Sequence, residues 1–136
     1  MIEAARAVVS FNRDLLGTPE RPICPMPANE YQHLIKAIGE EIYIELAHAW
    51  NDEDVVAMVD AQIDAIYFLM GGLYKCGLTA QQIHDCFMHV HEKNMEKKRG
   101  TVARRATDGV PDAIKPEGFV PAEAGIAAIL GLVTEG

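Results

Sequence analysis

Apolar residues recur at helical spacing from residue 3 to residue 16, and the pattern then stops. The apolar positions fall three or four residues apart, at Ala4, Val8, Phe11 and Leu15. Gly17, Thr18 and Pro19 follow, a combination that ends helices. The spacing predicts a helix over residues 3–16. Residues 18–29 hold four of the seven prolines, which neither continue a helix nor donate ladder hydrogen bonds, so this segment is predicted to be an extended connection.

Residues 30–96 carry the longest helical patterns of the chain and predict three core helices. The first runs from about Glu30 to Trp50, where the acidic turn at residues 51–54 interrupts it. Asp52 is predicted to cap the second core helix. The apolar stripe of that helix is Val55, Val59, Ile63, Ile66, Leu69 and Leu73.

Signals at its end separate this helix from the third. Lys75 suits the helix dipole at a C-terminus, and Gly77 accepts the left-handed conformation that caps one. Thr79 and Gln82 form a capping-box pattern, so the third core helix is predicted to start there and to reach about Glu96. The remaining tail, residues 97–136, is basic at first, contains proline and glycine, and ends in a short apolar piece at 122–132.

These patterns predict an all-α fold in a single domain, residues 1–136. Short connections between long helices favour antiparallel neighbours, so we expect an antiparallel helical bundle of about four main helices. Stripes as apolar as these are not expected to close a core with so few helices. The bundle is therefore expected to be completed by homo-oligomerisation.

Composition narrows the class of protein. The chain has 136 residues, of which 49% are hydrophobic and 24% charged, as in an ordinary globular domain. A net charge of -8 argues against a nucleic-acid partner.

The longest uncharged apolar runs, Ala65–Leu73 and Ala124–Val133, are about half of the roughly 20 residues that span a bilayer, so no membrane partner is expected. Glu3 and Arg6 do not fit a secretory signal, and three cysteines without CxxC spacing indicate reduced thiols. A cytoplasmic location is expected.

Acidic residues gather between positions 40 and 64, which contain eight carboxylates and no Lys or Arg. Glu41 and Glu45 are four residues apart and share one helix face, and Asp60 and Asp64 do the same on the next helix. Because the connection between the two helices is short, the two pairs can face each other.

Two interpretations of these carboxylates remain open from spacing alone. One is a solvated acidic surface. The other is a site for Mg²⁺ or Mn²⁺, hard cations that prefer carboxylate oxygens and retain water. The pair on the second core helix lies close to its apolar stripe, and partly buried carboxylates must be paired, protonated or metal-bound.

Basic residues gather at the end of the third core helix. Six of the twelve lie within 13 positions: Lys93, Lys97, Lys98, Arg99, Arg104 and Arg105. Interleaved aromatic residues, which nucleic-acid surfaces use, are missing from this stretch. Anionic groups of a small molecule fit better. A divalent-metal cluster together with phosphate-binding cations is typical of enzymes acting on phosphate esters or anhydrides.

The order of these elements resembles a known family. Glu40-Glu41 and Glu45, then Asp60 and Asp64, then an Asn-Met-x-Lys box at Asn94–Lys97 are similar to the all-α nucleoside triphosphate pyrophosphohydrolases. This is the MazG-like superfamily, which includes phosphoribosyl-ATP pyrophosphohydrolase. The resemblance covers roughly residues 5–121, because Asp-Gly and Lys-Pro pairs follow the box as in one subgroup.

The resemblance implies a reaction and a set of roles. The reaction is Mg²⁺-dependent hydrolysis between the α and β phosphates of a nucleotide, giving a monophosphate and pyrophosphate. Glu41 is the implied base, and the implied metal ligands are Glu41, Glu45, Asp60 and Asp64. The implied substrate-binding residues are Asn94, Lys97, Lys93, Arg104 and Lys115. The resemblance also implies a homodimer or a dimer of dimers.

Two positions depart from the pattern of the family. Where the family has the middle Glu of its E-E-x-x-E motif, the register fixed by Asp64 places Ile42, and Ala61 stands at the Glu of the later E-x-x-D motif. A register shifted by one residue matches Glu40-Glu41 to the double Glu but places Ile44 on the third, so the motif is incomplete in either register. These departures leave a second hypothesis open, a helical oligomeric binding or assembly module that kept the scaffold and lost turnover.

Overall fold

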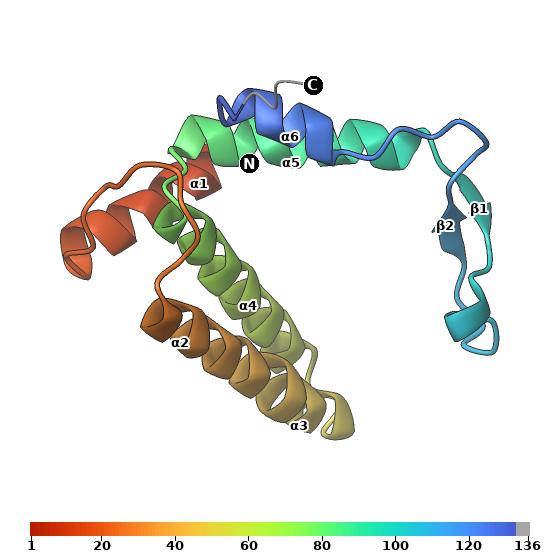
Figure 1. Ribbon diagram of the computed structural model, residues 1–136. Coiled ribbons are helices and arrows are strands. Elements are labelled where there is room, and N and C mark those ends of the chain that lie inside the picture. Colours follow the sequence, from red (N-terminus) through yellow and green to blue (C-terminus); the bar gives the residue numbers. More distant parts are fainter. Residues whose placement is uncertain (133–136) are drawn as a thin grey trace. The chain divides into compact units, whose positions relative to one another are not determined.

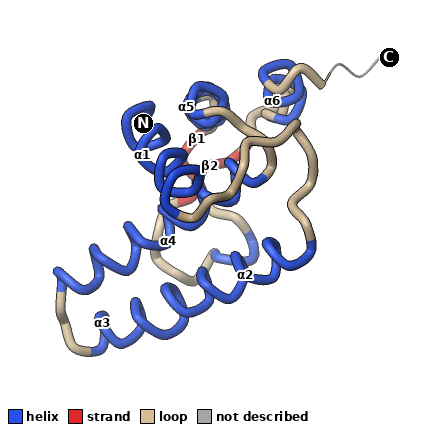
Figure 2. Tube along the Cα trace, turned by 90° about the vertical axis from the view of Figure 1, so that its left-hand side faces the viewer, coloured by secondary structure: helices blue, strands red, loops and turns tan. Residues whose placement is uncertain are grey.

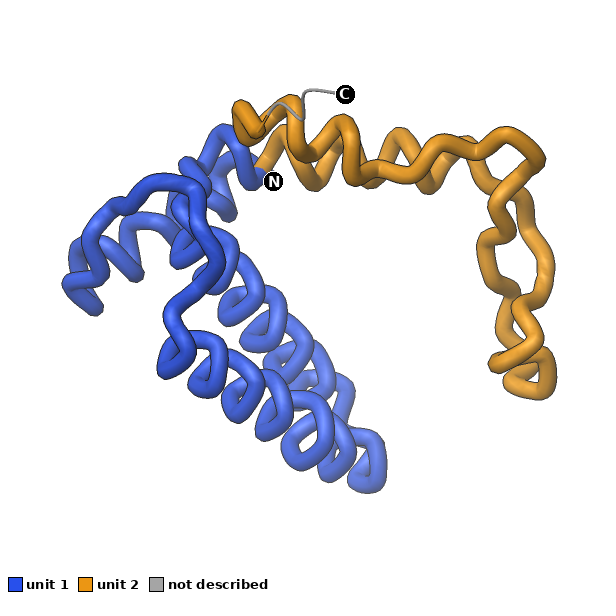
Figure 3. The backbone as a smooth tube through the Cα atoms, viewed as in Figure 1, with its two compact units in different colours: residues 1–83 blue, residues 84–136 orange. Residues whose placement is uncertain are grey.

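The computed structural model describes residues 1–132, so the last four positions of the predicted tail lie outside the described residues. The fold is all-α apart from one small two-stranded sheet, as the sequence predicts (Figure 1). The chain forms two compact units, residues 1–83 and residues 84–136 (Figure 3). Each unit is described in turn.

The first unit consists of three helical runs. The predicted first helix is α1 (Ile2–Ser10), which continues into the π-helical η1 (Phe11–Leu15). The first core helix is one continuous run, made of α2 (Ala28–Gly39), the π-helical η2 (Glu40–Leu46) and α3 (Ala47–Asn51). The second core helix is α4 (Val55–Lys75). The sequence pattern did not indicate the two π-helical stretches.

The run α2–η2–α3 lies beside α4 as a helical hairpin (Figure 2). The turn between them has Glu53 in the left-handed region, with φ of 55°. Asp54 follows in an extended conformation, and its carboxylate accepts a hydrogen bond from the Ala57 N–H at 3.0 Å. The predicted cap at Asp52 is therefore wrong. Asp54 is the N-cap because Glu53, in the left-handed conformation, extends the turn, so that α4 begins at Val55.

The proline-rich connection has no helix or strand between residues 16 and 27 and is held in place by polar contacts. The Arg21 guanidinium forms a two-pronged ion pair with Glu30 at 2.6 and 3.1 Å. The buried Tyr74 hydroxyl donates to the Thr18 carbonyl at 2.7 Å. The connection is thus fixed to the start of α2 and to the end of α4.

Two adjacent glycines let other segments approach α4 closely. A Cβ atom on Gly72 would lie 2.9 Å from Leu34 Cδ2 of α2. A Cβ atom on Gly71 would lie 3.1 Å from Asn12 Nδ2 of η1. Buried alanines, among them Ala37, Ala49, Ala61 and Ala65, line the rest of the hairpin contact. Small side chains therefore make up much of the buried part of the hairpin, and larger ones such as Tyr74 and Ile83 are buried elsewhere in the unit.

The apolar stripe of α4 faces outward. The side chains of Val55, Val59, Ile63, Ile66, Leu69 and Leu73 are 40–68% exposed. The opposite face, which packs on η2 and η1, carries Asp64, Tyr67 and Gly71. Our expectation that the stripe and the carboxylates lie close together is corrected, because they occupy different sides of α4.

By length and composition alone, α4 could cross a membrane. It has 21 residues, and an 18-residue stretch of it has a mean hydropathy of 1.4 and is 28% buried. Core helices of soluble proteins can have the same length and hydropathy, but they are mostly buried. Asp60 and Asp64 lie near the middle of α4, where a bilayer penalises a carboxylate by about 2.5–3.5 kcal/mol.

The third core helix is α5 (Ala80–Met95), which begins in the first unit and continues into the second. Its predicted start is confirmed. The Thr79 N–H donates to Gln82 Oε1 at 3.0 Å, and the Gln82 N–H donates to Thr79 Oγ1 at 3.1 Å. Gly77, with φ of 93°, has the predicted left-handed conformation.

The second unit continues with short elements. They are β1 (Lys98–Gly100), the 3₁₀ turn η3 (Ala103–Arg105), β2 (Asp112–Ile114) and α6 (Glu123–Ile129). The two strands pair antiparallel, with Arg99 opposite Ala113. Strands of three residues are too short to show alternation, so the sequence did not predict them. The helix α6 corresponds to the predicted apolar piece.

Candidate functional site

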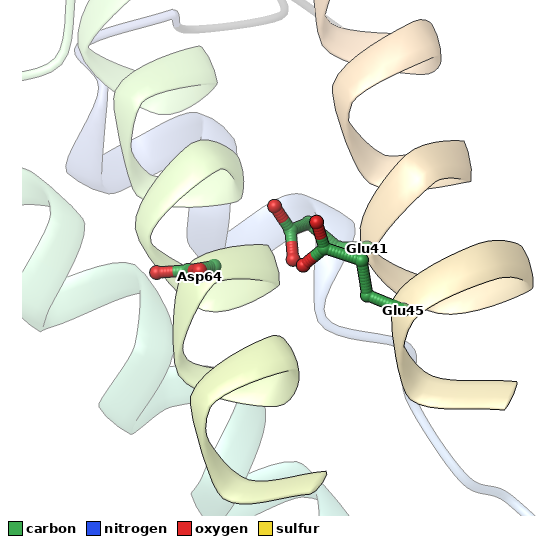
Figure 4. A group of neighbouring side chains, drawn as sticks. All are labelled: Glu41, Glu45 and Asp64. Atoms are coloured by element: carbon green, nitrogen blue, oxygen red, sulfur yellow. The ribbon is translucent and has the colours of Figure 1, made fainter. Parts of the chain in front are cut away.

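Three carboxylates converge between the two helices of the hairpin (Figure 4). Glu41 and Glu45 come from η2 and Asp64 comes from α4, and one oxygen of each lies within 4.8 Å of the others. The first two share a face because they are four residues apart. Asp64 lies opposite them because the turn after α3 is short and its N-cap fixes where α4 begins.

Burial and neighbouring charges raise the proton affinity of Glu41 and Asp64. Burial, a hydrogen bond with Glu45 and the charges of Glu45, Asp64 and Asp60 raise the pKa of Glu41 to about 7. Burial and the charges of Asp60 and Glu45 also raise the pKa of Asp64. Burial disfavours the charged form of a carboxyl group, and neighbouring negative charges do the same. The negative charge of these three carboxylates is therefore not balanced by positive charge near neutral pH.

The donor set fits a hard divalent cation. Glu41 Oε2 is buried and has no hydrogen-bond partner among the described residues. Among residues 1–132, no ion pair brings a Lys or Arg to the three carboxylates. Oxygen ligands with unbalanced negative charge are what Mg²⁺ and Mn²⁺ prefer. Glu41, Glu45 and Asp64 could hold such an ion, with water completing its shell.

Asp60 lies at the edge of this group. It is exposed and is not among the three residues whose oxygens lie within 4.8 Å of one another. Its charge still contributes to the raised pKa values of Glu41 and Asp64. Ala61, at the position where the family has a glutamate, is 1% exposed and packs in the hairpin contact.

A cavity of about 390 Å³ adjoins the carboxylates. Glu41 and Asp64 lie in its wall, together with Phe11, Asn12, Tyr67 and Gly71. The rings of Phe11 and Tyr67 meet edge to face, with centroids 5.3 Å apart and planes at 81°. Sequence reasoning missed Asn12, because a single polar residue in an amphipathic pattern gives no signal of tertiary burial.

Three of the predicted substrate-binding residues come together in the second unit. The Nζ atoms of Lys93, Lys97 and Lys115 lie 5.9, 5.5 and 5.9 Å from the centroid of the Phe119 ring. Asn94 Oδ1 accepts a hydrogen bond from Lys97 Nζ at 3.1 Å. Phe119 was not predicted, and the aromatic ring explains how three ammonium groups gather at one place. We call this set the lysine group.

Arg104, the remaining predicted residue, lies elsewhere in the second unit. It is exposed on η3 and is not one of the residues around Phe119. Its neighbour Arg105 binds the Asp112 carboxylate at 2.8 Å. The hydrogen bond from Arg105 and the charges of both arginines lower the pKa of Asp112. These contacts fix β2 beside η3.

The helical hairpin with converging carboxylates places the chain among α-helical proteins with a candidate metal site, and comparison with known families identifies the family. The family model described as phosphoribosyl-ATP pyrophosphohydrolase matches residues 10–94, more than half of the chain. The chain belongs to this family, part of the MazG-like superfamily of nucleotide pyrophosphohydrolases. Comparison with curated proteins and with solved structures found no match.

The matched segment contains the carboxylates and ends at Asn94. Membership of the family supports a nucleotide pyrophosphohydrolase activity in general. Most of the lysine group lies beyond the matched segment.

Proposed function

We propose that this protein is a Mg²⁺-dependent nucleotide pyrophosphohydrolase. It cleaves the α–β phosphoanhydride of an NTP, dNTP or related nucleotide to a monophosphate and pyrophosphate. The observation that carries the proposal is the convergence of Glu41, Glu45 and Asp64 on facing helices. Family membership supports the same class of reaction.

Glu41, Glu45 and Asp64 would hold the cation, and Asp60 would hold it from the edge of the group, directly or through water. Mn²⁺ could replace Mg²⁺ because both take oxygen ligands. The bound ion would supply Lewis-acid polarisation of a phosphoryl oxygen and neutralise charge. The raised pKa values of Glu41 and Asp64 support this role, since a divalent cation relieves the repulsion that raises them.

Glu41 is the proposed general base. The pKa of about 7 belongs to the metal-free chain, and a bound cation would lower it, so Glu41 would be ionised and able to accept a proton near neutral pH. Its Oε2 atom has no hydrogen-bond partner among residues 1–132, and the residue lines the cavity. A water held there would lose a proton to Glu41 as its oxygen attacks phosphorus, and the pyrophosphate would leave.

The lysine group is proposed to bind phosphate oxygens, with Asn94 holding Lys97 in position. Lys93 Nζ pairs with the Glu96 carboxylate at 3.0 Å, and the ammonium groups of Lys97 and Lys115 would gain from an added anion. Pyrophosphate or the triphosphate chain supplies such an anion. Arg104, away from the lysine group, is the weakest of the proposed substrate contacts.

We propose that a second copy of the chain covers the outward stripe of α4, in a homodimer or a dimer of dimers. Contiguous apolar patches on a soluble protein mark interaction surfaces. The stripe carries no charge from Val55 to Leu73 and is therefore complementary to itself.

The test is a product assay on common and modified NTPs and dNTPs, with Mg²⁺ or Mn²⁺, that separates pyrophosphate from orthophosphate. Asp64→Asn keeps the shape of the side chain and removes its charge, whereas Glu40→Gln changes an exposed neighbour outside the carboxylate group. We expect monophosphate and pyrophosphate from the wild type and from Glu40→Gln, and at least a hundredfold less from Asp64→Asn.

Orthophosphate as the main product would contradict the proposed bond. Turnover absent from every substrate, with Mg²⁺ or nucleotide binding retained, would favour the second hypothesis of a binding or assembly module. Ile42→Glu is then the first variant to make, since it restores the middle glutamate of the family's motif.

A further inference from the structure

We infer that the cavity beside the carboxylates holds the nucleoside part of the substrate, and that Asn12 binds an N–H group on the edge of the base. The inference rests on the proposed function, because it assumes that the phosphates lie at Glu41 and Asp64. It adds a residue that determines specificity and that the sequence patterns did not indicate.

The cavity has the shape that a nucleoside next to the carboxylates would need. Its wall follows one face of α4 from Asp64 through Tyr67 and Gly71 to Lys75. Asp64 and Lys75 are eleven residues apart, which is about 16 Å along an α-helix. Gly71 is about 10 Å from Asp64 on the same scale. A nucleotide whose α-phosphate lies at Asp64 would place its base near Gly71 and Asn12.

Asn12 is the polar side chain buried in this wall. It is 4% exposed, and its Nδ2 atom donates to the Val8 carbonyl at 2.9 Å. A carbonyl oxygen only accepts, so this bond fixes which way the amide is turned. Oδ1 then lies on the opposite side and accepts no hydrogen bond from the described residues. As part of the cavity wall, this amide offers an acceptor oxygen to which a ligand or water can donate.

Gly71 allows the amide to occupy this position. A Cβ atom there would lie 3.1 Å from Asn12 Nδ2 and 3.4 Å from Oδ1, so even an alanine would crowd the amide. At Gly71, α4 therefore has no side chain, which leaves room for Asn12 in the wall of the cavity. Glycine inside a helix is destabilising by about 0.5–1 kcal/mol relative to alanine, so close approach is the physical reason for it here.

Aromatic rings complete the cavity. Phe11 precedes Asn12 on η1, and its ring meets that of Tyr67 edge to face. Both rings lie in the same wall as the amide. An aromatic face accepts a stacked base of any identity, whereas an amide selects by hydrogen bonding. The combination of aromatic faces and one buried amide is what a base-binding cavity requires.

The experiment measures binding without turnover. Nucleoside 5′-monophosphates with the four common bases, and ribose 5-phosphate as the baseless probe, are titrated into the full chain with Mg²⁺. At least one monophosphate is expected to bind about tenfold more tightly than ribose 5-phosphate. In Asn12→Leu this preference for a base is expected to fall about tenfold, while ribose 5-phosphate binding is unchanged.

Two glycine variants provide a second test if Asn12→Leu folds poorly. Gly71→Ala displaces the amide and should weaken the preference for a base in the same direction. Gly39→Ala is the matched control, because a Cβ atom on Gly39 has nothing within 4 Å. The Val8 carbonyl also accepts from the Phe11 N–H, so replacing Asn12 does not leave it unpaired.

Each outcome either supports or contradicts the inference. Equal binding of ribose 5-phosphate and every monophosphate to the wild type would overturn the nucleoside cavity. A preference for a base that survives both Asn12→Leu and Gly71→Ala would overturn the role of Asn12. A preference for a base that these variants remove, in a protein that hydrolyses no triphosphate, would support the inference and contradict the proposed function.

Discussion

Glu41 is half-buried beside Glu45 and shares a hydrogen bond with it, and these effects, together with the charges of nearby carboxylates, raise the pKa of Glu41 to about 7. The ordinary value is 4.5. Between these values the folded chain binds more protons than the unfolded chain, so the free energy of unfolding falls as pH rises.

We therefore expect the metal-free protein to lose thermal stability from about pH 4.5 to pH 7 as Glu41 deprotonates. Melting curves in EDTA across this range would show the slope. Glu41→Gln should flatten it, whereas Glu40→Gln should keep it. A melting temperature that rises through this window in EDTA would contradict the assignment.

Mg²⁺ should reverse the destabilisation by the carboxylates. A ligand that binds only the folded chain stabilises it by about 2.7 kcal/mol at a hundred times its Kd. We expect Mg²⁺ or Mn²⁺ to raise the melting temperature of the wild type and of Glu40→Gln at pH 7.5. Asp64→Asn should lose most of this effect. An equal rise in all three proteins would place the ion elsewhere.

Asp54 caps α4, and Asp52 does not. Replacing an N-cap aspartate by alanine costs about 1 kcal/mol. We expect Asp54→Ala to lower the free energy of unfolding by about that amount, measured by urea denaturation. Asp52→Ala, two residues earlier in the same turn, should change it much less. Equal losses would show that the cap is shared.

Phe119 should matter for anion binding because it gathers the ammonium groups of the lysine group. We expect Phe119→Leu to weaken pyrophosphate binding several-fold in calorimetric titrations. Phe119→Tyr, which keeps an aromatic face, should retain it. Val120→Ala is the neighbouring control. Unchanged affinity in Phe119→Leu would mean that the lysines bind phosphate without the ring.

The outward stripe of α4 should be an interface between copies. We expect static light scattering to show a dimer or tetramer at micromolar concentration. Ile66→Glu, in the middle of the stripe, should shift the mass toward the monomer because it would bury an unpaired charge. Lys36→Glu on the exposed part of α2 should leave the mass unchanged. A monomeric wild type would contradict the proposal.

Local chemistry made part of this structure predictable. Gly77 and the pair Thr79 and Gln82 act within a few residues, and each has its predicted conformation. The convergence of Glu41 and Asp64 also followed from short-range facts, namely helical spacing and a short turn. Their closeness needed no knowledge of distant packing.

Other features depend on contacts between distant segments. Asn12 gains its significance only when η1 packs on α4, and nothing near it in the sequence records that approach. Phe119 meets lysines more than twenty residues away. The direction of the α4 stripe depends on which face meets η2, and its periodicity is the same whichever way it turns.

The three carboxylates that form the proposed metal site lower the stability of the metal-free chain. Glu41, Glu45 and Asp64 repel one another in a partly buried place, so neutralising any one of them would make the metal-free chain easier to fold. A copy of this gene released from selection for catalysis would therefore be expected to lose these acids early, through substitutions that stabilise the protein. The chain holds all three between η2 and α4, so the metal-free protein bears this electrostatic cost.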